Sequence, residues 1–138
     1  MTASDVRRYR TVRAVLRQRE RFLLVVHHGF AWSRERWGLP GGRIEVGEDF
    51  HETARRELHE ELSIHVDSLD VVGDYRYKGA LHRIFGGEFD GRILEFDRGE
   101  LQRIGWHTLD DVSKLAERGR LHAGFEETAI RDFLKLRE

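Results

Sequence analysis

Three glutamates crowd one short stretch of the chain and carry its strongest chemical signal. Glu60 lies three positions after Glu57, and Glu61 lies four positions after it. A helix turns by about 100° per residue, so it would place all three in one arc of roughly 100°. Carboxylates this close repel one another at neutral pH, and a bound divalent cation would relieve the repulsion. Because carboxylate oxygens are hard ligands, the cluster predicts a site for Mg²⁺ or Mn²⁺.

The stretch before these glutamates supports a ligand site over the competing explanation, which is a solvated, glutamate-rich helix face. It reads Leu39-Pro40-Gly41-Gly42, and glycines let a backbone approach a ligand closely because they have no Cβ atom. Arg56 stands directly before Glu57, and an arginine there can pair with a carboxylate and hold the helix against the loop. Since the glutamate arc lies beside an apolar stripe, we expect a cleft at the edge of the core.

The periodicity of the apolar residues predicts the elements that position this site. Between residues 49 and 62 they recur every fourth residue, as in an amphipathic helix. Alternation predicts a half-buried strand at 9–17, with Arg13 and Arg17 on its polar side, and a further strand at 69–78. The continuous apolar run at 22–26 predicts a strand covered on both faces. Short strands are expected at 80–85 and 92–96, with Asp90-Gly91 as a hairpin turn.

Two further helices are expected near the end of the chain, at 109–118 and 125–136. Thr108 and Asp111 form a capping pattern for the first of them, and Gly119 closes it. Strands with helices before, between and after them predict an α/β (α+β) protein. We expect an α/β/α sandwich with a mixed sheet between helices.

Composition narrows the class of protein. The chain has 138 residues, which suits a single domain over 1–138, and its formal net charge is −1. That balance argues against nucleic acid as a partner. The absence of cysteine excludes a disulfide framework, a thiolate zinc site and a cysteine nucleophile. No apolar run suits a membrane span and no secretory signal is seen, so we expect a cytoplasmic protein without a membrane partner.

The stretch from Gly42 to Ile64 resembles the Nudix box, G-x5-E-x7-R-E-U-x-E-E-x-G-U, in which U is a bulky aliphatic residue. Eight of the nine specified positions match, and the ninth, a glycine in the box, is Ser63 here. The box glycine follows the helix, where a left-handed residue is common. The matching residues are Gly42, Glu48, Arg56, Glu57, Leu58, Glu60, Glu61 and Ile64.

The resemblance implies a Nudix-type sandwich that hydrolyses a diphosphate linkage in nucleoside diphosphate-X compounds with Mg²⁺ or Mn²⁺. It implies that Glu57, Glu60 and Glu61 hold the metal, with the Gly41 carbonyl as a further ligand. Arg56 and Glu48 would pair and position the helix. Different members use different general bases, so Glu57 is our first choice and Glu100 the second. Gly42, Arg43 and, more weakly, His28 and His82 are assigned to substrate binding.

The sequence indicates the type of reaction more closely than the substrate. No signature of NADH-cleaving, ADP-ribose-cleaving or dinucleoside-polyphosphate members stands out, so we expect a MutT-like enzyme that converts a (deoxy)nucleoside triphosphate to the monophosphate and pyrophosphate. A diphosphatase for ADP-ribose or nucleotide sugars, including GDP-sugars, is the alternative. A second alternative is a nucleotide-sensing module without turnover. A third alternative is a diphosphate isomerase, which would need further catalytic groups. Either a monomer or a homodimer is expected.

Overall fold

The computed structural model describes residues 8–29 and 34–138. Its central feature is a mixed sheet with the strand order β4-β5-β1-β2-β6, in which β3 also pairs with β1. Strands β1 and β5 run parallel, and the other neighbours are antiparallel. The strands are β1 (Tyr9–Gln18), β2 (Arg21–His27), β3 (Gly41–Arg43), β4 (Asp70–Tyr77), β5 (Ala80–Glu88) and β6 (Leu101–Thr108).

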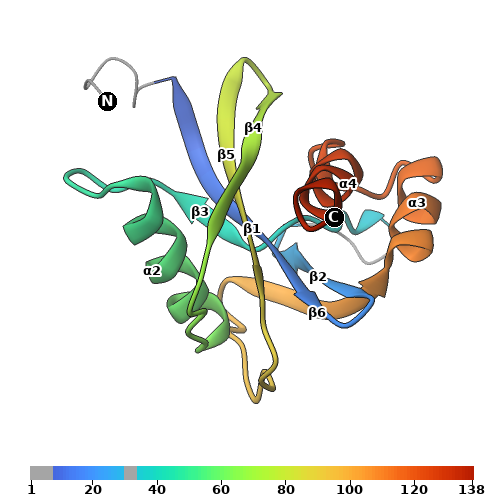
Figure 1. Ribbon diagram of the computed structural model, residues 1–138, viewed down its shortest axis with the longest axis horizontal. Coiled ribbons are helices and arrows are strands. Elements are labelled where there is room, and N and C mark those ends of the chain that lie inside the picture. The colour runs from blue at the N-terminus through green and yellow to red at the C-terminus, as the bar shows by residue number, and fades with distance from the viewer. Residues whose placement is uncertain (1–7, 30–33) are drawn as a thin grey trace.

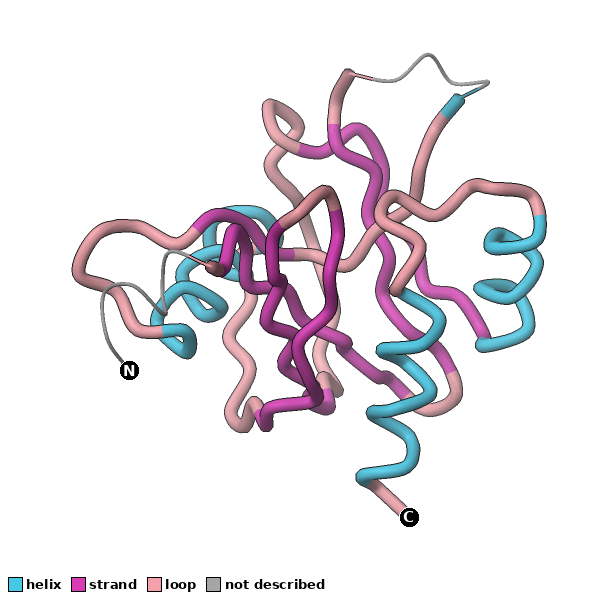
Figure 2. The backbone as a smooth tube through the Cα atoms, turned by 90° about the horizontal axis from the view of Figure 1, so that it is seen from above, coloured by secondary structure: helices cyan, strands magenta, loops and turns pink. Residues whose placement is uncertain are grey.

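Helices cover both faces of this sheet, so the expected α/β/α sandwich is confirmed (Figure 1). One side carries α2 (Phe50–Leu62), and the other carries α3 (Leu109–Glu117) and α4 (Glu126–Leu136). Figure 2 shows the same layers from above, with helices on either side of the strands. None of the helices in the described ranges is both long and apolar enough to cross a membrane.

Two apolar cores separate the layers. The first lies between the sheet and α2 and includes Leu23, Val25 and Leu58. The second lies between the sheet and the other two helices and includes Phe22, Leu24 and Phe133. Successive residues of β2 thus enter opposite cores, which confirms the expectation of a strand covered on both faces.

Strand β1 differs from the half-buried strand that alternation predicts. Val12, Ala14 and Leu16 enter the core beneath α2, but Val15 enters the opposite core, so both faces are covered. Arg13 shares that second face, yet it lines a cavity rather than the outer surface. The prediction failed because sequence alternation cannot show that the C-terminal helix returns to cover this face.

The segment 92–96 is also different from the prediction. It is irregular, and the tight turn of a hairpin lies instead at Lys78 and Gly79, whose φ angles are +51° and +75°. Ile93 and Phe96 are half-buried against the core beneath α2, which explains their apolar character without a strand. The last strand of the sheet is β6, which pairs with β2 along its length.

The helix that carries the glutamates has well-formed ends. The Asp49 side chain accepts a hydrogen bond of 2.8 Å from the Glu52 backbone N–H at the N-cap. Ser63 ends the helix in the left-handed conformation, with φ 54° and ψ 38°, and its N–H donates to the His59 carbonyl. The helix therefore ends at the position where the sequence pattern of the box places glycine. The expected helix near the end of the chain is confirmed too, with the Thr108–Asp111 capping box at the start of α3.

Candidate active site

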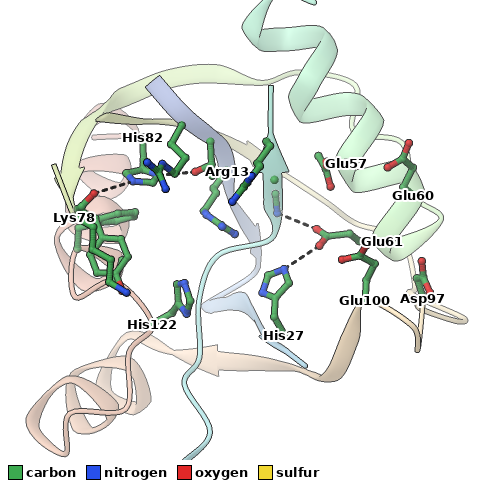
Figure 3. Close-up of a pocket in the computed structure, with 18 residues that line it drawn as sticks. Arg13, His27, Glu57, Glu60, Glu61, Lys78, His82, Asp97, Glu100 and His122 are labelled. Carbon is green, nitrogen blue, oxygen red and sulfur yellow. Dashed lines mark hydrogen bonds and ion pairs between the residues drawn. The ribbon is translucent and has the colours of Figure 1, made fainter. Parts of the chain in front are cut away.

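A cavity of about 650 Å³ opens between α2, the sheet and the loop before α4. Figure 3 shows carboxylates along one side of it and the side chains of His82, Lys78 and His122 along the other. The cavity lies beside the N-terminal half of β1, where β3 replaces β2 as the neighbouring strand. Its lining includes Arg10, Thr11, Arg13, His27, Gly41, Gly42, Arg43, Glu57, Glu60, Glu61, Tyr77, Lys78, His82, Asp97, Glu100, His122, Ala123 and Phe125.

The three glutamates of α2 all line this cavity, as their spacing along a helix predicts. Glu61 is buried and Glu57 is half-buried, whereas the side chain of Glu60 is 55% exposed. Arg56 Nη1 donates to Glu57 Oε1 at 2.8 Å and to Glu60 Oε2 at 3.1 Å. This single guanidinium group therefore offsets part of the repulsion between two of the three carboxylates.

Both oxygens of Glu61 have partners from other elements. Its Oε1 accepts a 3.0 Å hydrogen bond from the Gly41 backbone N–H, and its Oε2 lies 3.1 Å from His27 Nε2. The side chain of Glu61 is only 2% exposed. These contacts join the end of α2 to β3 and to the end of β2, so the carboxylate is held in place by two neighbouring strands.

The glycine pair allows the backbone of β3 to approach both β1 and α2. Gly41 has a φ of +147°, and a Cβ atom there would lie 2.2 Å from the Val12 carbonyl oxygen. A Cβ atom on Gly42 would lie about 2.5 Å from the carboxylate of Glu57. Neither position can hold a side chain without displacing its neighbour. The pair therefore brings the backbone of β3 into direct contact with the acidic side of the cavity.

Arg56 and Glu48 form the pair that the sequence resemblance implies. Arg56 Nε donates to Glu48 Oε2 at 2.6 Å, and Nη2 donates to Glu48 Oε1 at 3.0 Å. Hydrogen bonds from Arg56 hold the pKa of Glu48 at about 2. Nη2 also donates to the Arg43 carbonyl, which ties the loop to the helix. The box residues Leu58 and Ile64 lie in the core beneath the helix.

Glu57 is in a different electrostatic environment. Burial raises the pKa of its carboxyl group, and the negative charges of Glu61 and Glu60 act in the same direction. The hydrogen bond from Arg56 opposes this shift. A carboxylate whose protonated form is favoured in this way gains from a nearby cation, and it suits proton transfer.

A loop before β6 adds two carboxylates to the same cavity. Glu100 is exposed and lies beside the α2 glutamates on the same side of the cavity in Figure 3, together with Asp97. The Asp97 N–H donates to the Glu61 carbonyl at 2.8 Å, so this loop is attached to the end of α2. The structure thus brings both base candidates, Glu57 and Glu100, to one cavity.

The two histidines assigned to substrate binding are placed differently. His82 lines the cavity, and its Nδ1 lies 2.6 Å from Thr11 Oγ1. Burial lowers its pKa, so the neutral imidazole is favoured. His28 is not among the lining residues of the described cavity, and its ring contacts the Arg98 carbonyl at 2.6 Å.

The donor set fits a hard divalent cation by its chemistry, since it consists of carboxylate oxygens close to a glycine loop. Among residues 8–29 and 34–138, no three His, Asp or Glu side chains are yet gathered closely enough to hold an ion. In the described part of the chain Arg56 contacts Glu57 and Glu60, while His27 and Gly41 contact Glu61. Metal binding would exchange some of these contacts for metal–oxygen bonds.

Several lining residues carry no signal of a site in the sequence. Alternation predicts Arg13 on the polar face of a strand, and no motif includes Asp97, His27, His122 or Phe125. They come from β1, the end of β2 and the loops before β6 and α4, far apart in sequence. Only the pairing of β1 with β3 and β5 and the return of α4 bring them together.

Comparisons with known proteins agree with the fold and the motif. A family model described as NUDIX domain matches residues 7–131. The chain is 38% identical over 96 residues to a "Nucleoside triphosphate pyrophosphatase/Nudix hydrolase fusion protein" of Bifidobacterium longum, covering 64% of this chain and 20% of that protein. It is 30% identical over 109 residues to "NAD-capped RNA hydrolase NudC" of Yersinia enterocolitica, covering 75% and 40%.

A solved structure gives the same result for the fold. The NUDIX domain of Shewanella oneidensis NrtR, complexed with ADP ribose, superposes with a TM-score of 0.75 at 18% identity and covers 100% of both chains. The chain spans less than half the length of the two curated relatives described above. With the family model matched over most of its length, this chain belongs to the Nudix family.

Proposed function

We propose that this chain hydrolyses the diphosphate linkage of nucleoside diphosphate derivatives with the help of a divalent cation. The observation that carries the proposal is the arrangement of Glu57, Glu60 and Glu61 along one wall of a cavity, facing the Gly41-Gly42 backbone. The family match and the relatives that are named hydrolases support it. A protein that only binds nucleotides would gain nothing from three carboxylates that repel each other and the substrate phosphates.

The residues of the chain have separate roles in this proposal. Glu57, Glu60 and Glu61 would hold Mg²⁺ or Mn²⁺, with the Gly41 carbonyl as a further ligand. When bound, the cation neutralises the diphosphate and lowers the pKa of a coordinated water. Arg56, bound to Glu48 through two hydrogen bonds, orients Glu57. Arg43, beside the glycine pair on the same cavity wall, would contact the substrate.

Glu57 is proposed to take the proton of the attacking water. The water oxygen forms a bond to phosphorus, the bridging P–O bond breaks, and the leaving phosphate carries away the bonding electron pair. Glu100 is the competing base, since it lines the same cavity from the loop before β6. Comparing Glu57→Gln with Glu100→Gln at saturating Mg²⁺ separates them. We expect the larger loss of kcat for Glu57→Gln, and the reverse order would assign the base to Glu100.

For the substrate we propose a (deoxy)nucleoside triphosphate, cleaved to the monophosphate and pyrophosphate. A diphosphatase acting on ADP-ribose or nucleotide sugars is the alternative. Because one relative is named an NAD-capped RNA hydrolase and another, of Bartonella henselae, an RNA pyrophosphohydrolase, RNA 5′ ends belong in the same comparison. A nucleotide-sensing module without turnover is the other alternative function.

The test is a product screen by chromatography with Mg²⁺ or Mn²⁺. Its arms are the eight common nucleoside triphosphates, ADP-ribose, GDP-mannose, NADH and RNA oligonucleotides with a 5′-triphosphate or an NAD cap. We expect pyrophosphate and a nucleoside monophosphate from at least one triphosphate. Turnover of only a nucleotide sugar, ADP-ribose, NADH or RNA would reject the triphosphate assignment. Nucleotide binding without any turnover would reject hydrolysis.

A further inference from the structure

Arg13 stands at the centre of the cavity with most of its hydrogen-bonding capacity unused. It lies between the carboxylates of α2 and the histidines of the opposite wall in Figure 3. Its Nη1 donates to the Leu39 carbonyl at 3.0 Å. No ion pair within 4.0 Å among the described residues includes Arg13. Since a guanidinium carries five N–H donors, this contact leaves a forked set of donors for a ligand or water.

The surroundings of Arg13 place it next to the reacting part of the site. Arg13 is the strand partner of Gly41, and a Cβ atom on Gly41 would lie 2.8 Å from Arg13 Cγ. Gly42 in turn packs against the Glu57 carboxylate. The glycine pair is therefore a thin spacer between the Arg13 side chain and the acidic wall. A ligand phosphate next to the metal-binding carboxylates would lie within reach of Arg13.

Arg13 is the main positive charge in the inner part of the cavity, because the histidines of the opposite wall are uncharged. Burial lowers the pKa of His82, and it lowers the pKa of His122 to about 4, so both are neutral at pH 7. Arg10, Arg43 and Lys78 also line the cavity, but all three are exposed at its rim. An inner anionic group of a ligand would thus find its cationic partner at Arg13.

We propose that Arg13 binds a phosphate group of the substrate through its free guanidinium donors, on the side of the cavity away from Glu60. This proposal rests on the proposed function. It goes beyond the Nudix box, which contains no residue of β1. Arginine suits the role because its planar fork matches two phosphate oxygens at once, and a buried positive charge gains strongly from an anionic partner. The competing explanation is that Arg13 only anchors the loop through Leu39.

The test measures two ligands separately by titration calorimetry: Mn²⁺ alone, and inorganic pyrophosphate in the presence of saturating Mn²⁺. Arg13→Gln should weaken pyrophosphate binding by at least about tenfold, the scale of a lost charge-assisted contact. Arg13→Lys should lie between it and the wild type, because lysine keeps the charge but loses the fork. The matched control is Arg17→Gln on the same strand, where Arg17 pairs with Glu88 outside the cavity. The control should bind pyrophosphate like the wild type.

Mn²⁺ affinity separates phosphate binding from loop anchoring. Loss of an anchor at Leu39 would disturb Gly41 and its hydrogen bond to Glu61, and would weaken Mn²⁺ binding too. Loss of a phosphate ligand leaves Mn²⁺ affinity unchanged or raises it. A joint loss of both affinities would overturn the proposal, as would a loss of pyrophosphate affinity below tenfold or a wild type that binds no pyrophosphate. If Arg13→Gln does not fold, Arg13→Lys serves as the test. A pyrophosphate affinity of Arg13→Lys equal to that of the wild type would overturn the proposal.

Failure of the Arg13 proposal can be distinguished from failure of the proposed hydrolase function. If no nucleotide is hydrolysed but the pyrophosphate result holds, the hydrolase proposal fails and the role of Arg13 as a phosphate ligand stands. If a nucleotide is hydrolysed and Arg13→Gln leaves its KM unchanged, the assignment of Arg13 fails alone.

Discussion

Arg56 donates two parallel hydrogen bonds to Glu48, at 2.6 and 3.0 Å, and so joins the helix of the three glutamates to the loop before it. The same guanidinium also contacts Glu57, Glu60 and the Arg43 carbonyl. One side chain therefore sets the position of the loop, the helix and two proposed metal ligands. Both side chains are largely buried: that of Arg56 is 20% exposed and that of Glu48 is 15% exposed.

Removing the charge of Glu48 should destabilise the protein. We expect Glu48→Gln to lower the free energy of unfolding at pH 7 by roughly 1.5–3 kcal/mol, the range of hydrogen bonds to charged groups. Urea denaturation measures this. Glu45→Gln is the matched control, because Glu45 is 65% exposed and lies 3.5 Å from the same guanidinium. It should change stability by less than about 0.5 kcal/mol.

The same pair predicts a pH dependence of stability. The pKa of Glu48 is lowered from 4.5 to about 2 in the folded chain, so its contribution is fully present above pH 4.5. It is lost as the pH falls from there through about 2. The Glu48→Gln variant should therefore lose less stability over this range than the wild type does. Parallel acid-dependence curves for the two proteins would contradict this account of the pair.

The sequence predicted the helix of the glutamates and its contacts because these depend on short spacings. The apolar stripe fixes the buried face of α2, and the Nudix box specifies Glu48 and Arg56 at a distance of eight residues. Arg13 could not be found in this way. Its role as a lining residue depends on the pairing of β1 with β3 and on the return of the last helix, and neither can be derived from local periodicity.

The error at 92–96 has a similar origin. The short apolar segment there resembles a strand, but Ile93 and Phe96 pack individually against the core beneath α2. The adjacent strand β6 shows no clean alternation of buried and exposed residues, because most of its positions are half-buried. Its pairing with β2 is a long-range contact and left no pattern in its sequence.

The left-handed backbone of Ser63 determines how a glycine at this position should affect stability. At φ 54°, serine is held in a conformation that costs about 1 kcal/mol and that glycine would relieve. The gain in unfolded-state entropy of glycine opposes this by up to about 1 kcal/mol. We expect Ser63→Gly to raise the urea midpoint slightly or leave it unchanged, with Mg²⁺ affinity unaltered. A large loss of Mg²⁺ affinity would show that Ser63 shapes the metal site.

His122 should make the protein sensitive to mild acid. Its pKa is lowered from 6.5 to about 4, mainly by burial and further by the charge of Arg13. The unfolded chain therefore takes up a proton at a higher pH than the folded chain, and stability falls as the pH drops from 6.5 to 4. His122→Asn should reduce this fall in thermal or urea denaturation, whereas the same substitution at the exposed His59 should not. Equal pH dependence in all three proteins would contradict the prediction.

The carboxylates of α2 are proposed to perform metal-dependent hydrolysis. The most direct measurement is kcat as a function of Mg²⁺ concentration, on the best substrate of the screen, for the wild type, Glu57→Gln and the control Glu52→Gln, an exposed glutamate of the same helix. We predict saturable dependence on Mg²⁺, no turnover in chelator, a kcat lowered by about 10²-fold or more for Glu57→Gln, and near wild-type turnover for the control. Turnover in chelator, or a Glu57→Gln variant as active as the wild type, would contradict the account.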